Sequence, residues 1–382
     1  MNETPYSRKV ELFVALLWIA AVVAATLQQG LAHQSNNFLM FRAASRHLLE
    51  GRDLYAAYPA LYFDFYKYTP AVALLFLPFA LLPFVWSMLA WNALNASVLW
   101  AAIGTVLPRR GATIARAVVF LDLLGSLQNV QSNGLVAGLI ILTFAAYERE
   151  HTILGGFAAS IGGAIKLFPL AGVSFAIMHP RRVRFVLAAA VAFIALLLLP
   201  LLVTPPATLL AQYASWSAIQ ATDTLRRGLT VMQIAELLFH RNWPNIPFQI
   251  AGTLVLLAPL TLRRDRWKEW RFRLHYLCSV LVFSVIFNHR SESPSFVIAV
   301  SGFAIWFVSL DRRTMATWAL FGFFVVCTIL SSSDAMPDAI QRDFFDAYSF
   351  KTVPCIVAWL VLQRSLWKSA PKSASGRHAG DG

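Results

Sequence analysis

Charged residues are scarce in this chain. They account for 13% of its 382 residues, whereas hydrophobic residues account for 58%. A soluble domain usually has about a quarter charged and about half apolar residues. Uninterrupted apolar runs recur along the sequence, and a run of about 20 apolar residues crosses a bilayer as a helix. The composition therefore excludes an ordinary soluble protein and predicts an all-α polytopic membrane protein.

Cysteine and metal-binding motifs are nearly missing as well. Cys278, Cys327 and Cys355 all lie in or beside apolar segments, and no CxxC pair or Cys/His spacing of a metal site occurs. We interpret the three as small buried hydrophobic residues. P-loop, GxGxxG, HExxH and GxSxG motifs are also lacking, and no DxD-type metal site is evident. We expect no cofactor and, for an enzyme, metal-independent chemistry, with a loosely held ion as the alternative.

Acidic residues are fewer than basic ones, 19 against 32, which gives a net charge of +13. The basic residues cluster in short segments beside apolar runs, as expected for cytoplasmic loops under the positive-inside rule. There is no soluble basic domain to bind nucleic acid, so we expect no nucleic-acid partner. The strongest basic clusters lie in residues 181–184, 263–273, 312–313 and 364–377.

Threading the chain from these clusters gives about 12 spans, with both termini in the cytoplasm. We expect a single membrane domain over residues 1–366 and a disordered cytoplasmic tail over residues 367–382. Arg8 and Lys9 precede the first apolar run, and no clear cleavage site follows, so this run is interpreted as an uncleaved span rather than a signal peptide.

The apolar piece TPAVALLFLPFALLP breaks the regular pattern of spans. It contains Pro78 and Pro83 and is too short to cross a bilayer, so we expect it to be interfacial or re-entrant. With this piece left out of the membrane, every basic cluster falls on the cytoplasmic side. The first outer loop is then 30–69, and a large outer loop is 204–245.

The same threading places the polar interruptions of the apolar runs on the outer face. Such a gathering is typical of a membrane enzyme or transporter with its site on that side. The interruptions are Asn36 and Asn37, FDFYKYTP (63–70), QNVQSN (128–133), the Lys166 region, residues 204–245 and NHRSES (288–293).

Lys166 lies in the segment IGGAIKLFPL, where apolar residues surround it. Pro169 removes a helix hydrogen bond just beyond it, so a helix should break there. The lysine either snorkels at a helix turn or contacts the phosphate of a lipid-linked substrate. In QNVQSNG, Gln131 and Asn133 either begin and cap a helix or donate and accept hydrogen bonds to sugar hydroxyls.

Two further segments combine charge with other polar groups. NHRSES contains His289, Arg290 and Glu292. It reads either as an ordinary outer turn or as a site in which Arg holds a phosphate and His or Glu moves a proton. YFDFYKYTPA contains Asp64, Lys67 and Tyr68, which either belong to an interfacial aromatic belt or place rings against a sugar beside a carboxylate.

A last charged group lies in the large outer loop. DTLRRGLT contains Asp223, Arg226 and Arg227. A solvated surface is the plain interpretation, and the rim of a substrate groove is the alternative.

Four motifs in order resemble glycosyltransferase family 87, also called DUF2029, of the polytopic GT-C class. They are NFLMFRAASRHLLEGRDLY, FYKYTPAVALLFLPFALLPFVWSMLAWNALN, QSNGLVAGLIIL and AIKLFPLAGVSF. The match covers residues 35–185 well, and the second half agrees in hydropathy and loop placement. The resemblance implies a GT-C-like fold with interfacial helices in the first outer loop.

The resemblance also implies a chemistry: transfer of a sugar, a hexose such as mannose, with inversion, from a polyprenyl-phosphate donor. The acceptor would be a glycan or lipid at the outer face of the plasma membrane. On this interpretation Lys166 and Arg290 contact the leaving phosphate, and Gln131 and Asn133 contact the sugar.

The family's first loop opens with an aspartate taken to be the general base, and the matching residue here is Asn37. An amide accepts no proton at any relevant pH, so another carboxylate must serve, or the chain has lost this chemistry. We expect Asp64 to be the base, followed by Glu292. Asp53 is the third candidate, although a turn explains it equally well.

The missing aspartate also motivates a second hypothesis from another class. The chain would then bind a lipid-linked glycan without reacting, as a transporter, flippase or non-catalytic relative. Inverted repeats would favour a secondary transporter, and none is apparent between the two halves.

The opening segment of the first outer loop reads as an interfacial amphipathic helix. Phe38, Phe41, Ala44, Leu48 and Leu49 recur at helical spacing, and Gly51 is expected to end the helix. Arg42, Arg46 and His47 are expected on its polar side.

Overall fold

Every regular element in the part of the chain that the structure describes is helical. The computed structural model describes residues 5–32, 35–223, 227–332 and 336–368, and in these ranges it contains no strand. The prediction of an all-α polytopic membrane protein is confirmed at this level. Arg226 and the greater part of the predicted tail, residues 369–382, lie outside the described residues.

The first nine α-helices are α1 (Pro5–Ala32), α2 (Asn36–Leu49), α3 (Pro70–Leu75), α4 (Leu77–Ala80), α5 (Phe84–Val106), α6 (Arg109–Gln128), α7 (Asn133–Glu148), α8 (Thr152–Ile165) and α9 (Arg182–Leu198). The others are α10 (Pro206–Asp223), α11 (Val231–Phe239), α12 (Asn245–Leu262), α13 (Trp270–Ile286), α14 (Phe296–Ser309), α15 (Met315–Phe324), α16 (Asp338–Ile340) and α17 (Thr352–Trp367). The 3-10 and π segments are η1 (Phe168–Met178), η2 (Leu199–Leu202), η3 (Arg264–Arg266), η4 (Ser293–Ser295), η5 (Val325–Ile329), η6 (Leu330–Ser332) and η7 (Gln341–Asp346).

Within the described residues, five helices are long and apolar enough to cross a membrane. Between and after them run shorter apolar segments such as α7, α8, η1 and α17. The apolar helices support a membrane protein, while the total of about 12 spans and the GT-C architecture stay predictions. The five are Arg8–Ala32, Phe84–Val106, Arg109–Gln128, Arg182–Leu202 and Asn245–Leu262.

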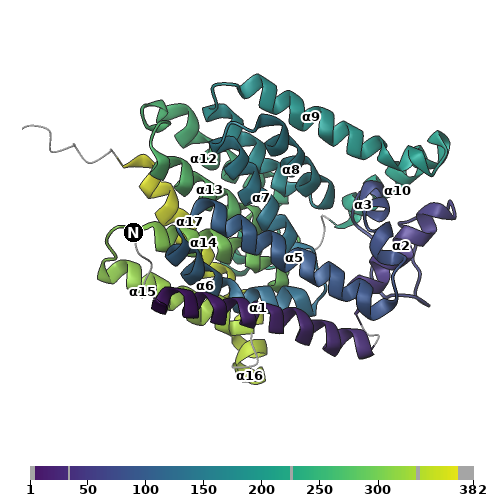
Figure 1. Cartoon of the computed structure of the whole chain (residues 1–382), viewed down its shortest axis with the longest axis horizontal. Helices are drawn as coiled ribbons and strands as arrows, with labels where there is room; N and C mark the ends of the chain where they lie inside the picture. Colours follow the sequence, from purple (N-terminus) through teal and green to yellow (C-terminus); the bar gives the residue numbers. More distant parts are fainter. Residues whose placement is uncertain (1–4, 33–34, 224–226, 333–335, 369–382) are drawn as a thin grey trace, which may run out of the picture.

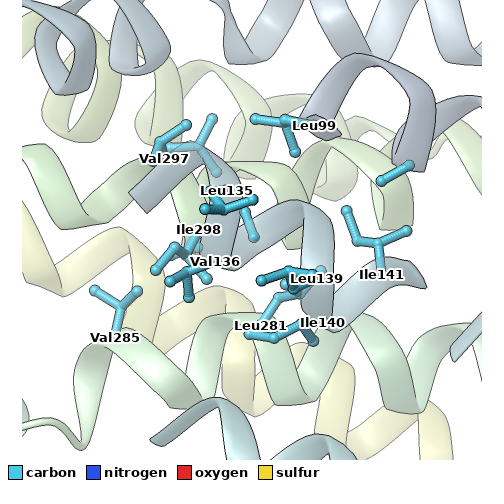
Figure 2. Close-up of a cluster of buried hydrophobic side chains, with 14 of the residues drawn as sticks. Leu99, Leu135, Val136, Leu139, Ile140, Ile141, Leu281, Val285, Val297 and Ile298 are labelled. Atoms are coloured by element: carbon cyan, nitrogen blue, oxygen red, sulfur yellow. The ribbon is translucent and has the colours of Figure 1, made fainter. Parts of the chain in front are cut away.

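The core lies around α7, which packs against α5, α13 and α14, and Figure 2 shows aliphatic side chains of all four helices gathered there. Val136 and Ile298 are fully buried in this cluster. A Cβ at Gly138 of α7 would lie 2.7 Å from the Val98 side chain and 3.0 Å from its backbone. The glycine therefore lets α5 and α7 approach closely.

The predicted interfacial helix is α2, and its end has a Schellman geometry. Gly51 has φ +68°, its N–H donates to Leu48 O at 3.3 Å, and the Arg52 N–H donates to His47 O at 2.9 Å. Gly51 thus ends the helix as predicted. The expectation that His47 lies on the polar side is wrong: Tyr58 folds back over it with ring centroids 4.1 Å apart, so His47 is 3% exposed.

The proline-containing segment after the first outer loop is broken into two short helices, α3 and α4, which meet at Phe76. Neither is long enough to cross a bilayer, as expected for an interfacial or re-entrant piece. Ser45 of α2 donates a hydrogen bond to Ala73 O at 2.7 Å, which fixes this piece against the first outer loop. Figure 1 shows α2, α3 and α10 together at one end of the molecule.

The two predicted outer loops are joined to each other. Gln212 of α10 accepts a hydrogen bond from the Leu54 N–H at 3.0 Å and donates one to Arg52 O at 2.7 Å. Trp216, one turn further along α10, donates to Lys67 O at 3.0 Å. The large loop 204–245 therefore contains a helix that packs onto the loop 30–69, and the space between them opens into a cavity.

Candidate functional site

A cavity of about 870 Å³ lies at the junction of the outer loops with the α8–η1 connection and the segment between α13 and α14. Most of the candidate site residues line it: Asn37, Asp64, Lys67, Tyr68, Gln131, Lys166, His289, Arg290 and Glu292. Asn133 lies immediately behind the wall, where it contacts Lys166. Residues from widely separated parts of the sequence therefore meet in one place.

A chain of hydrogen bonds links the cavity's lysine to one of its carboxylates. Lys166 Nζ donates to Asn133 Oδ1, Asn133 Nδ2 donates to Gln131 Oε1, and Gln131 Nε2 donates to Glu292 Oε2 at 2.9 Å. We call these four residues the amide relay. All its donors point from the cation towards the anion, so the two side-chain amides are held in one orientation.

Local backbone structure places each member of the relay. Helix α8 ends at Ile165, and Lys166 is extended, with φ −144° and ψ 135°, before η1 begins with Pro169 in its first turn. This is the helix break that the proline predicts. Asn133 is the first residue of α7 and is fully buried.

The electrostatics of the relay leave Lys166 charged at neutral pH. Burial lowers its pKa to about 8, and the nearby Glu292 carboxylate opposes that shift. The neighbouring Tyr68 phenol has its pKa raised well above the usual value, by burial first and by Glu292 second. The cavity wall therefore presents an ammonium and a protonated phenol as donors.

The Glu292 carboxylate faces the cavity. The residue is exposed, and one oxygen accepts the hydrogen bond from Gln131. The other oxygen, Oε1, receives no hydrogen bond from any of the described residues. It is thus available to a hydroxyl group of a bound molecule.

Asp64 has a different environment, although it lines the same cavity. Its oxygens lie 3.2 Å from Lys67 Nζ, and Oδ1 also accepts the Phe65 N–H at 2.8 Å. The Lys67 carbonyl in turn accepts hydrogen bonds from Trp216 and Gln220 of α10. Asp64 and Lys67 therefore form a local ion pair on a loop that is fixed to α10.

The segment that carries His289, Arg290 and Glu292 is held by backbone pairing with the end of the large outer loop. The Gly228 N–H donates to His289 O at 2.8 Å, and the Leu229 N–H donates to Ser291 O at 2.7 Å. A Cβ at Gly228 would lie 2.1 Å from Ser291 O. Only glycine allows this approach, a requirement that the sequence analysis missed.

Arg227, the neighbour of that glycine, contradicts the plain interpretation of a solvated surface. Its side chain is 8% exposed and binds Glu236 at 2.6 Å, Asn245 at 3.0 Å and the Trp243 carbonyl. It lines the cavity, and these bonds hold the connection between α10 and α12 in place.

The two asparagines of the first outer loop both make structural hydrogen bonds. Asn36 Oδ1 accepts the Phe63 N–H at 2.9 Å, and Asn37 Nδ2 donates to Asn129 O at 2.9 Å. Asp53, the third candidate base, accepts from the Tyr55 N–H and from Ser215 Oγ, each at 3.0 Å, and is absent from the cavity lining. The hydrogen bond from the Tyr55 N–H, two residues further on, explains Asp53 as a turn residue.

Sequence reasoning also missed a buried ion pair behind the cavity. Lys351 Nζ lies 3.2 Å from Asp122 Oδ1 and 3.0 Å from Ser293 Oγ. An aspartate inside an apolar segment was the available signal, but its partner lies far away in the sequence. Among the described residues, no group of three or more His, Cys, Asp or Glu residues is arranged to hold a metal ion.

The fold and the cavity define a membrane protein with an open-sided cavity lined by lysine, carboxylate and amide groups. The family model for glycosyltransferase family 87 matches residues 65–287. The chain therefore belongs to glycosyltransferase family 87 and is a glycosyltransferase. No curated protein matches the chain. The matched range contains Lys67, Gln131 and Lys166, whereas Asp64 and Glu292 lie outside it.

Proposed function

We propose that this glycosyltransferase transfers a hexose from a polyprenyl-phosphate donor to a glycan or lipid acceptor, with inversion and without a metal. The observation that carries the proposal is the amide relay, which keeps a cation and a carboxylate on one cavity wall without direct contact. A lipid-phosphate sugar needs both groups, one for the leaving phosphate and one for the incoming hydroxyl.

The cationic end of the relay suits the leaving phosphate. Lys166 is half-buried, so its ammonium interacts with an anion more strongly than it would in water. Arg290 lines the same cavity and offers a guanidinium for a second contact. As the bond between the anomeric carbon and the phosphate oxygen breaks, the phosphate takes the electron pair, and these cations stabilise its charge.

The carboxylate end of the relay suits the acceptor. The acceptor hydroxyl oxygen forms the new bond to the anomeric carbon from the face opposite the phosphate, and its proton passes to Glu292 Oε1. This attack inverts the anomeric configuration. Gln131 lines the cavity beside this carboxylate, and its amide is a neutral group of the kind that matches sugar hydroxyls. The Asn133 amide is fully buried and bonded within the relay, so we assign it to holding Lys166 and Gln131 rather than to the sugar.

We assign the base to Glu292 rather than to Asp64, which the sequence analysis placed first. Both Asp64 oxygens already contact Lys67, and accepting a proton would break that ion pair. Glu292 has a carboxylate oxygen that faces the cavity and is not engaged by the described residues. Its place at the end of the relay also sets it on the same wall as Lys166.

Asn37 favours a second candidate function, binding or transport of a lipid-linked glycan without reaction. Asn37 lines the cavity at the position that corresponds to the family's aspartate, and it cannot take up a proton. A non-catalytic relative would hold the donor on Lys166 and leave it intact.

We further propose that the cavity opens to the outer face of the plasma membrane, with both termini of the chain in the cytoplasm, and that the protein forms a single membrane domain over residues 1–366. Basic residues at 181–184 and 263–273 support this orientation. Membrane lipids and the two substrates are the partners it implies.

The test is a transfer assay in membranes with a panel of labelled polyprenyl-phosphate sugars. An active enzyme moves label from one of these donors to a glycan or lipid product. Glu292→Gln is expected to lower the transfer rate by about 10²–10⁴-fold, because a general base is lost, while the protein still binds farnesyl phosphate. Saturable farnesyl phosphate binding with no transfer from any donor would support the non-catalytic function instead.

A further inference from the structure

A buried ion pair lies directly behind the wall that carries Glu292. Asp122 in α6 and Lys351 at the start of α17 lie 3.2 Å apart, with side chains 2% and 5% exposed. The pair connects two helices that are remote in sequence. Neither residue lines the cavity, so no step of the proposed transfer uses them directly.

Lys351 also contacts the short segment that follows Glu292. Its Nζ donates to Ser293 Oγ at 3.0 Å and lies 5.0 Å from the centre of the Phe296 ring. Ser293 begins η4 and Phe296 begins α14, so the lysine contacts both ends of the 3-10 turn. Glu292 is the residue that precedes this turn, and its carbonyl accepts the Ser295 N–H at 2.9 Å.

Stability alone gives a poor account of the pair. Buried ion pairs contribute little or no net stability compared with well-packed apolar residues. Here, moreover, the pair is incompletely satisfied: Asp122 Oδ2 is buried and has no hydrogen-bond partner among the described residues. An arrangement of this kind is better suited to fixing a geometry than to strengthening the fold.

We propose that Asp122 and Lys351 are positioning residues that set the orientation of Glu292 through Ser293. The proposal rests on the proposed function in so far as Glu292 is the base. Asp122 fixes the lysine ammonium, the ammonium fixes the Ser293 hydroxyl, and η4 then holds the Glu292 carboxylate towards the cavity at the end of the amide relay.

The decisive variant is Ser293→Ala, because it removes the hydrogen bond to Lys351 and leaves the ion pair in place. We expect kcat to fall about tenfold, the size of effect given by one hydrogen bond to a charged group, with KM within about twofold of the native value. Ser301→Ala is the matched control: Ser301 is fully buried in α14, and its one side-chain hydrogen bond among the described residues stays within that helix, to Val297 O at 2.7 Å.

A second measurement reads the orientation of Glu292 without any turnover. The exposed carboxylate is labelled with a water-soluble carbodiimide and an amine, and the rate at Glu292 is followed by mass spectrometry. We expect a several-fold change in that rate in Ser293→Ala and none in Ser301→Ala. If the wild type transfers no sugar, the proposed function fails, and the labelling rate alone decides whether the pair positions Glu292.

A double variant separates positioning from folding. Lys351→Met alone would leave the Asp122 charge buried without a counter-ion and is expected to unfold the protein. Asp122→Asn with Lys351→Met removes both charges, so it should fold and show the same loss of kcat and change in labelling as Ser293→Ala. Native kcat and a native labelling rate in Ser293→Ala or in the double variant would overturn the proposal.

Discussion

Two lysine–carboxylate pairs line the same cavity and differ in what lies between their charges. Asp64 and Lys67 touch directly at 3.2 Å, and their side chains remain 34% and 23% exposed. Lys166 and Glu292 are instead separated by the amides of Asn133 and Gln131. The first pair arises within one loop, whereas the second joins the end of α8 to the start of η4.

The difference shows how a site keeps charged groups usable. In a direct pair each charge is already satisfied by its partner, and a partly exposed contact of this kind contributes only about 0.2–1 kcal/mol. Two amides between the charges keep both side chains oriented while an ammonium and a carboxylate oxygen stay available to a ligand. The direct pair is thus suited to fixing a loop, and the separated pair to binding and proton transfer.

Neutralising each carboxylate in turn is the strongest test of the difference between the two pairs. Glu292→Gln should lower kcat by about 10²–10⁴-fold, because a general base is lost. Asp64→Asn removes a loop contact, so its effect on kcat should be about tenfold or less. Steady-state transfer rates measure both, with melting temperatures as a check on folding. The reverse order of effects would assign the base to Asp64.

Lys166 gives the next largest effect and a pH dependence. Its pKa of about 8 means that the ammonium is fully formed below that pH and is lost above it. A phosphate monoester is already doubly charged above about pH 7, so farnesyl phosphate affinity should fall as pH rises from 7 to 10.

Lys166→Met removes the charge at every pH. It should weaken farnesyl phosphate binding by about 10–100-fold at pH 7, a loss typical of a hydrogen bond to a charged group, and make the affinity independent of pH from 7 to 10. Fluorescence of Trp216 and Trp243, which line the cavity, follows the binding. A wild-type affinity that stays constant up to pH 10 contradicts the role of this lysine.

Gly228→Ala tests the backbone pairing between residues 228–229 and residues 289–291, the segment that precedes Glu292. The added Cβ would lie 2.1 Å from Ser291 O, so the two segments must separate. We expect a stability loss of about 1–3 kcal/mol, as for other overpacked positions, together with reduced kcat. Gly125→Ala is the control, since a Cβ there meets nothing within 4 Å. Thermal unfolding in detergent compares the two variants.

The smallest effect is expected for Asn37→Asp, which restores the family's aspartate. The carboxylate cannot donate to Asn129 O and would instead lie 2.9 Å from that carbonyl oxygen. We expect a loss of about 1 kcal/mol in stability and no increase in kcat. A clear gain in transfer rate would show that position 37, and not Glu292, is the natural place of the base.

Much of the site could be read from the sequence because its residues are conspicuous there. Lys166 stands alone in an apolar run, and Gln131 and Glu292 lie in polar interruptions that the positive-inside rule placed on one face. The structure brings these three residues together in the cavity lining, while the membrane topology stays a prediction. The helix break after Ile165 was likewise local, because Pro169 dictates it.

Most of the features that the sequence did not predict depend on contacts between residues that are distant in the chain. The residues around Lys351 in the sequence do not predict that Asp122 is its partner. Nor does the sequence predict that Gly228, among the glycines, approaches another backbone segment. The burial of His47 was missed because helical spacing says nothing of Tyr58 returning over it. The ion pair of Asp64 with Lys67, three residues further on, is a local contact that the sequence analysis did not predict either.

The backbone pairing of residues 228–229 with residues 289–291 has a consequence for how such an enzyme diversifies. Both hydrogen bonds use main-chain atoms, so they place a demand on Gly228 but none on the side chains at 289 and 290. Those positions line the cavity, and the two main-chain bonds themselves are compatible with other side chains there. Substitutions at position 289 or 290 can therefore change the wall of the cavity while these two main-chain hydrogen bonds are kept.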